Sequence, residues 1–229
     1  MGENKMDTIN GGQIDKLLED ISSIKNVINR NKPLLQQVLN PAHFRLFTLL
    51  AAISVIGFAM LFFFLMQHYG SFSSIPRLTR YVIFAAMTAD FFFMQILKRR
   101  TFLKTGKRID PTFTFGRLLK EFFTDRIAHV YVPIMGLIIY LSIYFINKNI
   151  PYYIVPAGSI GIGLLYNFIG SLTDIRQYLI VGYWFLITGT GVLIFNNIAV
   201  PISISITFGC GLLIFSALGC LSVRANKEE

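Results

Sequence analysis

The sequence predicts an all-α fold: a polytopic bundle of six transmembrane helices whose N- and C-termini both lie in the cytoplasm. Of its 229 residues, 54% are hydrophobic and only 14% are charged, whereas soluble domains carry about 25% charged residues. Six apolar stretches are each long enough to cross a hydrocarbon core of roughly 30 Å. The Lys and Arg residues lie mainly between these stretches, which is typical of a membrane topology.

The segment 1–40 is expected to be a cytoplasmic tail with an amphipathic helix. Apolar residues recur there at heptad spacing: Ile14, Leu17, Ile21, Ile24 and Ile28. Lys16 and Asp20 lie off this stripe, and such mixed charge favours protein contact over adsorption to a membrane. Self-association, docking on a cytoplasmic partner and lying on the membrane are the three alternatives. Asn40 and Pro41 then predict the start of the next helix.

The transmembrane domain is predicted to cover residues 41–223, followed by a cytoplasmic tail at 224–229. Its spans are expected at about 44–67, 78–97, 128–146, 152–172, 176–195 and 198–223. The segment 98–127 is interpreted as a basic segment at the membrane interface, in which Asp110 and Pro111 predict the start of an interfacial helix leading into the third span. Its first cations are candidate ligands of anionic lipid headgroups: Lys98, Arg99, Arg100, Lys104, Lys107 and Arg108. The alternative is that these residues only orient the chain.

The distribution of cations predicts the orientation. With the N-terminus inside, the cytoplasmic segments hold all but three of the 21 Lys and Arg residues, the exceptions being Arg77, Arg80 and Lys148. Orientation follows this bias, so both termini are expected inside. Tyrosines near the predicted span ends are interpreted as interfacial aromatics: Tyr69, Tyr81, Tyr131, Tyr152, Tyr153 and Tyr178.

Asp90 is the only acidic residue inside a predicted span. A carboxylate in mid-membrane is costly, so it has to meet a partner, face a water-filled cavity or be protonated. One interpretation is a proton or cation site. The other is a hydrogen bond between helices, and the candidate partners are Ser142, Tyr140, Tyr166 and Asn167.

Small residues cluster in the last three spans. Ala157 with Gly161, and Ser159 with Gly163, have the spacing at which helices approach closely in lipid. They predict either packing inside the bundle or a surface for another membrane subunit.

No sequence motif points to catalysis. Zinc-type Cys/His spacing, HExxH, GxSxG and Walker loops are absent, and His43, His68 and His129 all fall at predicted span ends. We therefore expect no enzyme, metal or cofactor. The net charge of +9 could suggest nucleic acid. Because the cations flank apolar runs, the expected partner is instead the lipid bilayer.

The order of these features resembles a group of uncharacterised bacterial six-span integral membrane proteins with an N-terminal amphipathic cytoplasmic helix. The likeness rests on IDKLLEDISSIKNVI (14–28), on the basic stretch after the second span and on AGSIGIGLLYNFIG (157–170). The resemblance implies no established activity, and the expected location is a bacterial inner membrane.

The predicted function is that of a non-enzymatic accessory, scaffold or regulatory subunit. Its N-terminal helix would contact another protein or a second copy, giving a homo-oligomer or a larger membrane complex. The alternative is a small proton- or cation-coupled transporter or channel that uses Asp90.

Overall fold

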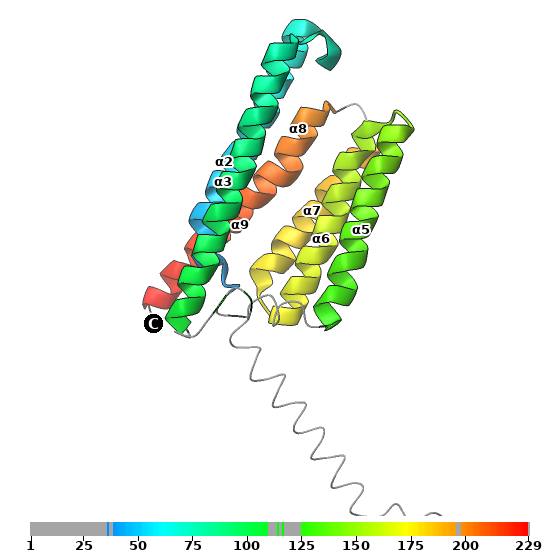
Figure 1. The fold of residues 1–229 in the computed structure, drawn as a ribbon. Helices are drawn as coiled ribbons and strands as arrows, with labels where there is room; N and C mark the ends of the chain where they lie inside the picture. Colours follow the sequence, from blue (N-terminus) through cyan, green and yellow to red (C-terminus); the bar gives the residue numbers. More distant parts are fainter. Residues whose placement is uncertain are drawn as a thin grey trace, which may run out of the picture.

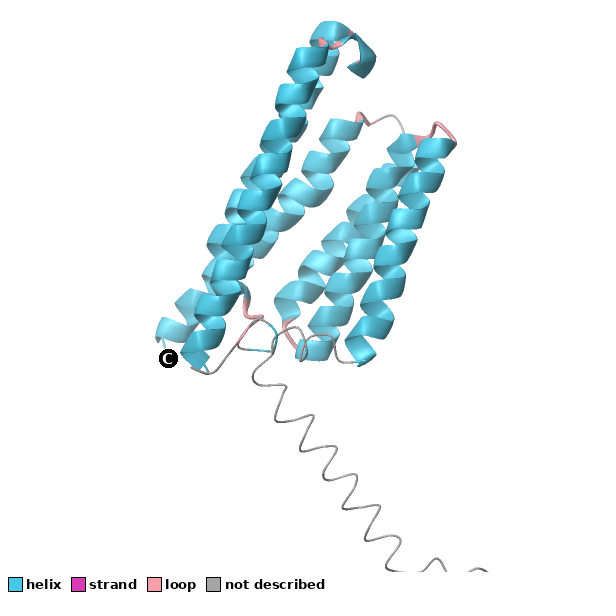
Figure 2. Ribbon diagram, in the orientation of Figure 1, coloured by secondary structure: helices cyan, strands magenta, loops and turns pink. Residues whose placement is uncertain are grey.

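The computed structural model describes residues 36, 39–109, 114, 116, 125–195 and 198–228. Every regular element of these residues is a helix (Figure 2). The long helices are α2 (Pro41–Tyr69), α3 (Arg77–Ile109), α5 (Asp125–Asn147), α6 (Ile154–Thr173), α7 (Arg176–Ile194) and α9 (Cys210–Glu228). The short elements are η1 (Phe72–Ser74), η2 (Pro151–Tyr153), α8 (Val200–Ile204) and η3 (Ser205–Gly209).

Six helical stretches of the described residues are long and apolar enough to cross a membrane. The sixth combines α8, η3 and most of α9. The long helices run side by side, and α2 begins at the end of the bundle where the C-terminus lies (Figure 1). We call this end, which carries Pro41 and Glu228, the basal end, and the opposite end the distal end. The predicted class, an integral membrane protein built as a helix bundle, is confirmed.

α2 begins where the sequence predicts. The side chain of Asn40 accepts a hydrogen bond from the backbone N–H of Ala42 at 3.0 Å. Pro41 occupies the first turn, where the missing N–H would have had no helical partner. At the distal end, Gly70 follows the helix with a φ of 75°. Glycine adopts this left-handed conformation without strain, so it ends the helix.

α3 is longer than the predicted second span, because it continues without interruption from Arg77 to Ile109. Residues 98–109 contain no proline and are rich in good helix formers. The described part of the helix reaches Ile109. The predicted lipid-binding cations therefore extend the helix that carries Asp90. Residues 110–113, 115 and 117–124, which make up most of the predicted interfacial helix, lie outside the described residues.

The predicted sixth span contains a π-helical turn, η3, which the sequence did not indicate. A widened turn disturbs the regular ladder of backbone hydrogen bonds. The indole N–H of Trp184 on α7 donates to the carbonyl oxygens of Ile206 (3.2 Å) and Thr207 (3.3 Å). Trp184 thereby stabilises an irregular backbone at a depth where lipid supplies no replacement hydrogen bonds.

The main contacts between helices follow one order across the bundle: α3, α2, the α8–α9 pair, α7, α6 and α5. α2 packs along α9 and η3, and α7 packs along α6. By contrast, α3 makes its main contacts with α2, and α5 with α6 and η2. α3 and α5 thus lie at two opposite edges of the bundle (Figure 1).

Small residues bring α6 and α7 together. A Cβ added to Gly163 would lie 2.9 Å from the carbonyl oxygen of Gly182. The hydroxyl of Ser159 donates to the carbonyl oxygen of Phe185 at 2.8 Å. The predicted pair Ser159 and Gly163 therefore lies in an interface inside the chain, whereas Gly161 adjoins α5.

Replacing Gly163 by alanine is expected to destabilise the protein by about 1–3 kcal/mol, as overpacking of a tight core does. The new methyl group would press on the backbone of α7, which cannot move aside as a side chain can. Gly57→Ala on α2 is the matched control, because no atom lies within 4 Å of a Cβ built there. Reversible unfolding in mixed micelles measures both variants. Equal stabilities would contradict the close contact.

Candidate functional site

Asp90 faces α2. The hydroxyl of Ser54 on α2 donates to Oδ1 of Asp90 at 3.0 Å. The predicted partners of Asp90 were wrong, because α3 makes its main contacts with α2. The four candidates belong to α5 and α6, at the other side of the bundle: Ser142, Tyr140, Tyr166 and Asn167.

The carboxylate of Asp90 is only partly enclosed by its own chain. Asp90 is half-buried, and among the described residues Ser54 is the one hydrogen-bond donor to it. It lies eight residues from Lys98 and ten from Arg80, or about 12 and 15 Å along the helix axis. A charge near mid-span costs about 2.5–3.5 kcal/mol on insertion scales. One hydroxyl leaves most of the carboxylate's hydrogen-bonding capacity unused.

The predicted lipid-binding cations lie on the basal third of α3, and all six side chains are exposed: Lys98, Arg99, Arg100, Lys104, Lys107 and Arg108. On the inner face of this segment, the ring of Phe102 lies 4.6 Å from that of Phe44, measured between centroids, and Thr105 is buried. The cations therefore line the outer surface of the basal end. Contact with anionic headgroups stays a prediction.

The chain preceding α2 is fixed to the basal end of the bundle. Gln36 Nε2 donates to the carbonyl oxygen of Thr173, the last residue of α6, at 2.7 Å. The hydroxyl of Tyr178 on α7 donates to the carbonyl oxygen of Leu39 at 2.9 Å. Leu39 is only 5% exposed. These contacts attach Gln36 and Leu39, which we call the root of the N-terminal segment, to the turn between α6 and α7. The heptad residues Ile14, Leu17, Ile21, Ile24 and Ile28 lie outside the described residues.

Tyr178 is part of a buried aromatic cluster. It is 7% exposed, and its ring centroid lies 5.6 Å from that of Tyr166 and 4.9 Å from that of Phe215. The interpretation of Tyr178 as an interfacial aromatic was wrong, because Leu39 and Phe44 pack in the same cluster. Leu39 and Tyr178 are 139 positions apart. No local sequence pattern could therefore have revealed their contact.

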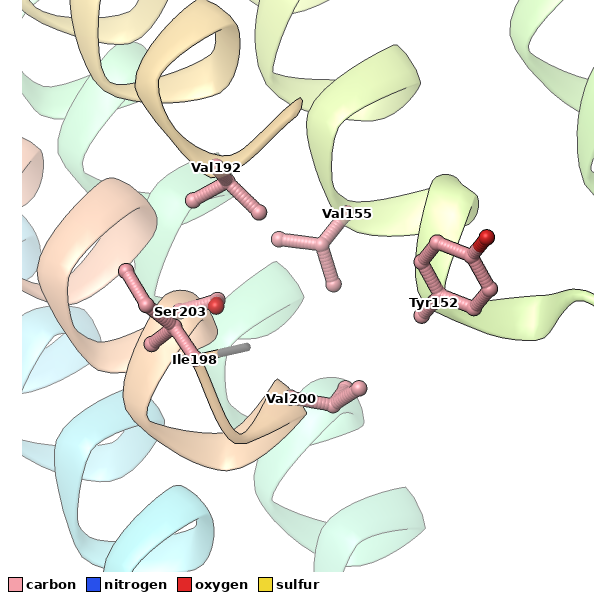
Figure 3. A pocket seen from close by; sticks show the side chains of 6 residues that line it. All are labelled: Tyr152, Val155, Val192, Ile198, Val200 and Ser203. Carbon is pink, nitrogen blue, oxygen red and sulfur yellow. The ribbon is translucent and has the colours of Figure 1, made fainter. Parts of the chain in front are cut away.

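A small cavity of about 10 Å³ lies at the distal end between α6, α7 and α8. Ser203 is 2% exposed, and its hydroxyl forms no hydrogen bond with the described residues. Figure 3 shows Ser203 near Val155 and Val192, whereas the hydroxyl of Tyr152 is directed away from them. A bound water needs at least about 10–15 Å³ and two to four polar partners. We interpret the cavity as a packing gap.

A larger hollow of about 270 Å³ lies between α5 and α6. It is lined by apolar side chains such as Ile138 and Leu164, and Tyr153 contributes its only side-chain hydroxyl. Such a lining suits a hydrocarbon chain and offers no acid, base or nucleophile. Neither hollow includes Asp90. Within the described ranges, no three His, Cys, Asp or Glu side chains gather as they would around a metal ion.

Removing the hydroxyl of Tyr178 is expected to loosen the root of the N-terminal segment. Tyr178→Phe deletes one buried hydrogen bond and leaves the Leu39 carbonyl without this donor, so the local free energy of opening should fall by about 1–2 kcal/mol. Hydrogen exchange of peptides covering residues 36–45 measures the change. Tyr183→Phe is the control, since Tyr183 lies on the same helix with an exposed side chain. Unchanged exchange in Tyr178→Phe would show that this bond does not hold the segment.

The described residues thus offer a partly enclosed mid-span carboxylate, a basic outer surface at the basal end and an anchored N-terminal root. No family model, curated protein or solved structure matches the chain. What the geometry establishes is an integral membrane protein with six candidate spans.

Proposed function

We propose that this protein is a non-enzymatic accessory or scaffold subunit whose N-terminal helix holds a protein partner at the membrane surface. The anchored root of the N-terminal segment is the observation that carries this proposal. Gln36 and Leu39 are bound to the α6–α7 end of the bundle, so a helix that precedes them is held beside the membrane. A binding segment held in place loses less conformational freedom when its partner docks.

The heptad pattern of residues 14–28 supports a protein as the ligand of this segment. Two heptads are too short for a stable isolated helix in water, so the apolar stripe needs a surface to cover it. Its mixed charge favours a protein surface over the membrane. The partner is either a second copy of the chain or another subunit of a membrane complex.

We also propose an orientation of the protein in the membrane, with the basal end in the cytoplasm. The extension of α3 and the end of α9 lie at the basal end, and Gln36 and Leu39, which precede α2, are bound there. In the sequence, these two helix ends and the segment 1–40 carry most of the Lys and Arg residues. The positive-inside rule then makes the basal end cytoplasmic. We place the protein in a bacterial inner membrane, where the six exposed cations of α3 would meet anionic headgroups.

Placing charges on the heptad stripe is expected to release the partner. Ile21→Glu with Ile24→Glu buries two carboxylates in the contact, so the intermolecular crosslinks to Lys16 and Lys25, which lie beside the stripe, should be lost. Ser22→Glu with Ser23→Glu adds the same charge off the stripe and should leave the complex intact. Amine crosslinking in membranes followed by mass spectrometry gives the readout. A parent protein that is monomeric and alone, or equal behaviour of the two variants, would refute the proposal.

A second candidate function is proton- or cation-coupled transport through Asp90, which is favoured by its half-buried position near mid-span. Asp90→Asn should then abolish ion-dependent flux in liposomes, because the amide cannot exchange a proton at this site. Asp174→Asn is the control. Asp174 lies in the turn after α6 with a φ of 55°, a conformation that asparagine tolerates. A parent protein without flux would exclude transport.

A further inference from the structure

The two edge helices each expose a polar group inside their spans. On α3, the half-buried Asp90 has Ser54 as its one donor among the described residues. On α5, Tyr140 is 64% exposed, and its hydroxyl forms no hydrogen bond with any described residue. Tyr140 lies seven residues from Asn147, about 10 Å inside the helix end. One edge therefore carries an acceptor and the other a donor.

Contacts inside the chain place Asp90 and Tyr140 at similar depths. Each contact connects neighbouring helices at one level, in order from α2 to α5: Ile56 with Gly209, Gly211 with Phe185, Gly163 with Leu186, and Gly161 with Ile138. Ser54, the partner of Asp90, lies two residues basal of Ile56, and Tyr140 lies two residues distal of Ile138. With the steps along each helix between these contacts included, Asp90 is roughly 7–8 Å more basal than Tyr140, at about 1.5 Å per residue.

Because α3 and α5 run in opposite directions, the side chains of Asp90 and Tyr140 lean toward each other, which reduces their difference in depth. Side chains on a helix lean toward its N-terminus. α3 runs from the distal to the basal end, so the side chain of Asp90 leans distally. α5 runs the other way, so that of Tyr140 leans toward the basal end. If α3 of one molecule lay beside α5 of another in the same membrane, the carboxylate and the hydroxyl would lean toward each other.

Small residues at the same depths make room for such a contact. Ala86 precedes Asp90 by one turn of α3 and is exposed, at the level of Tyr140. Gly136 precedes Tyr140 by one turn of α5, and no atom lies within 4 Å of a Cβ placed there. Each polar side chain would thus face a small residue on the opposite helix, and small residues are what allow close approach of helices in lipid.

We infer that copies of this protein associate edge to edge in the membrane, with α5 of one copy packed along α3 of the next, so that Tyr140 of one copy donates a hydrogen bond to Asp90 of its neighbour. The carboxylate site is then completed by the second copy. The contact joins two different surfaces, so repetition gives a ring or a chain of copies rather than a closed two-fold dimer. This interface is separate from the N-terminal contact proposed above.

A contact of α3 with α3 is the main competing arrangement. It would place two Asp90 carboxylates near each other and leave both Tyr140 hydroxyls without a partner. The α3–α5 contact instead satisfies one donor and one acceptor in every copy. It is therefore favoured by hydrogen-bond complementarity.

Cysteine crosslinking in membranes distinguishes these arrangements. In a protein with Cys210 and Cys220 replaced by serine, Ala89→Cys and Leu137→Cys place thiols on the exposed surfaces of α3 and α5 at similar depths. A short bifunctional thiol reagent should produce a ladder of trimers and larger species only when both cysteines are present. The single variants should give no ladder. No crosslinking of the double variant, or dimers from Ala89→Cys alone, would overturn the inference.

The hydrogen bond has its own test in the double-cysteine protein. Tyr140→Phe and Asp90→Leu should each reduce the species above dimer roughly threefold, the effect of a typical hydrogen bond between membrane helices, and combining them should add little. Tyr144→Phe, one turn away and also exposed, should leave the ladder unchanged. An unchanged ladder in Tyr140→Phe would overturn the proposed pair. Ile21→Glu with Ile24→Glu should preserve the ladder, and its loss there would assign the association to the N-terminal helix instead.

Discussion

Close packing of α6 against α7 is the constraint on which the rest of the bundle depends. Lipid removes the hydrophobic driving force between helices, so they associate through short-range packing and hydrogen bonds. The backbones at Gly163 and Gly182 lie too near for larger side chains, and Ser159 adds a hydrogen bond across the interface. α9 packs against α7, and α2 packs against α9. The helices that lack such partners, α3 and α5, lie at the edges.

The class and the approximate spans could be predicted from the sequence because a lipid core demands long apolar runs. Asn40 and Pro41 also revealed the start of α2. The lateral order of the helices could not be predicted, because helices in lipid can be apolar on every face and no amphipathic stripe shows which face turns inward. The predicted partners of Asp90 were wrong for this reason, since its donor Ser54 lies on α2.

Long-range polar contacts were hidden for a related reason. Trp184 supports the π-helical turn through carbonyl oxygens more than twenty residues away, and Tyr178 reaches Leu39 across most of the chain. Both residues look in sequence like ordinary membrane aromatics. Their hydrogen bonds matter because lipid offers no alternative partner to an unpaired backbone group. Single polar atoms on aromatic side chains therefore carry information that hydropathy and spacing do not express.

The polar side chains on the edge helices α3 and α5 also lack enough hydrogen-bond partners within the chain. A helix that faces only lipid gains no hydrogen bond from a carboxylate or a phenol inside its span, and the carboxylate is costly near mid-span. Asp90 obtains one hydrogen bond from Ser54, and Tyr140 obtains none within the described residues. The strong internal packing is concentrated in α6–α7 and α2–α9. Polar groups on the weakly packed edges are therefore better explained by neighbouring protein than by neighbouring lipid.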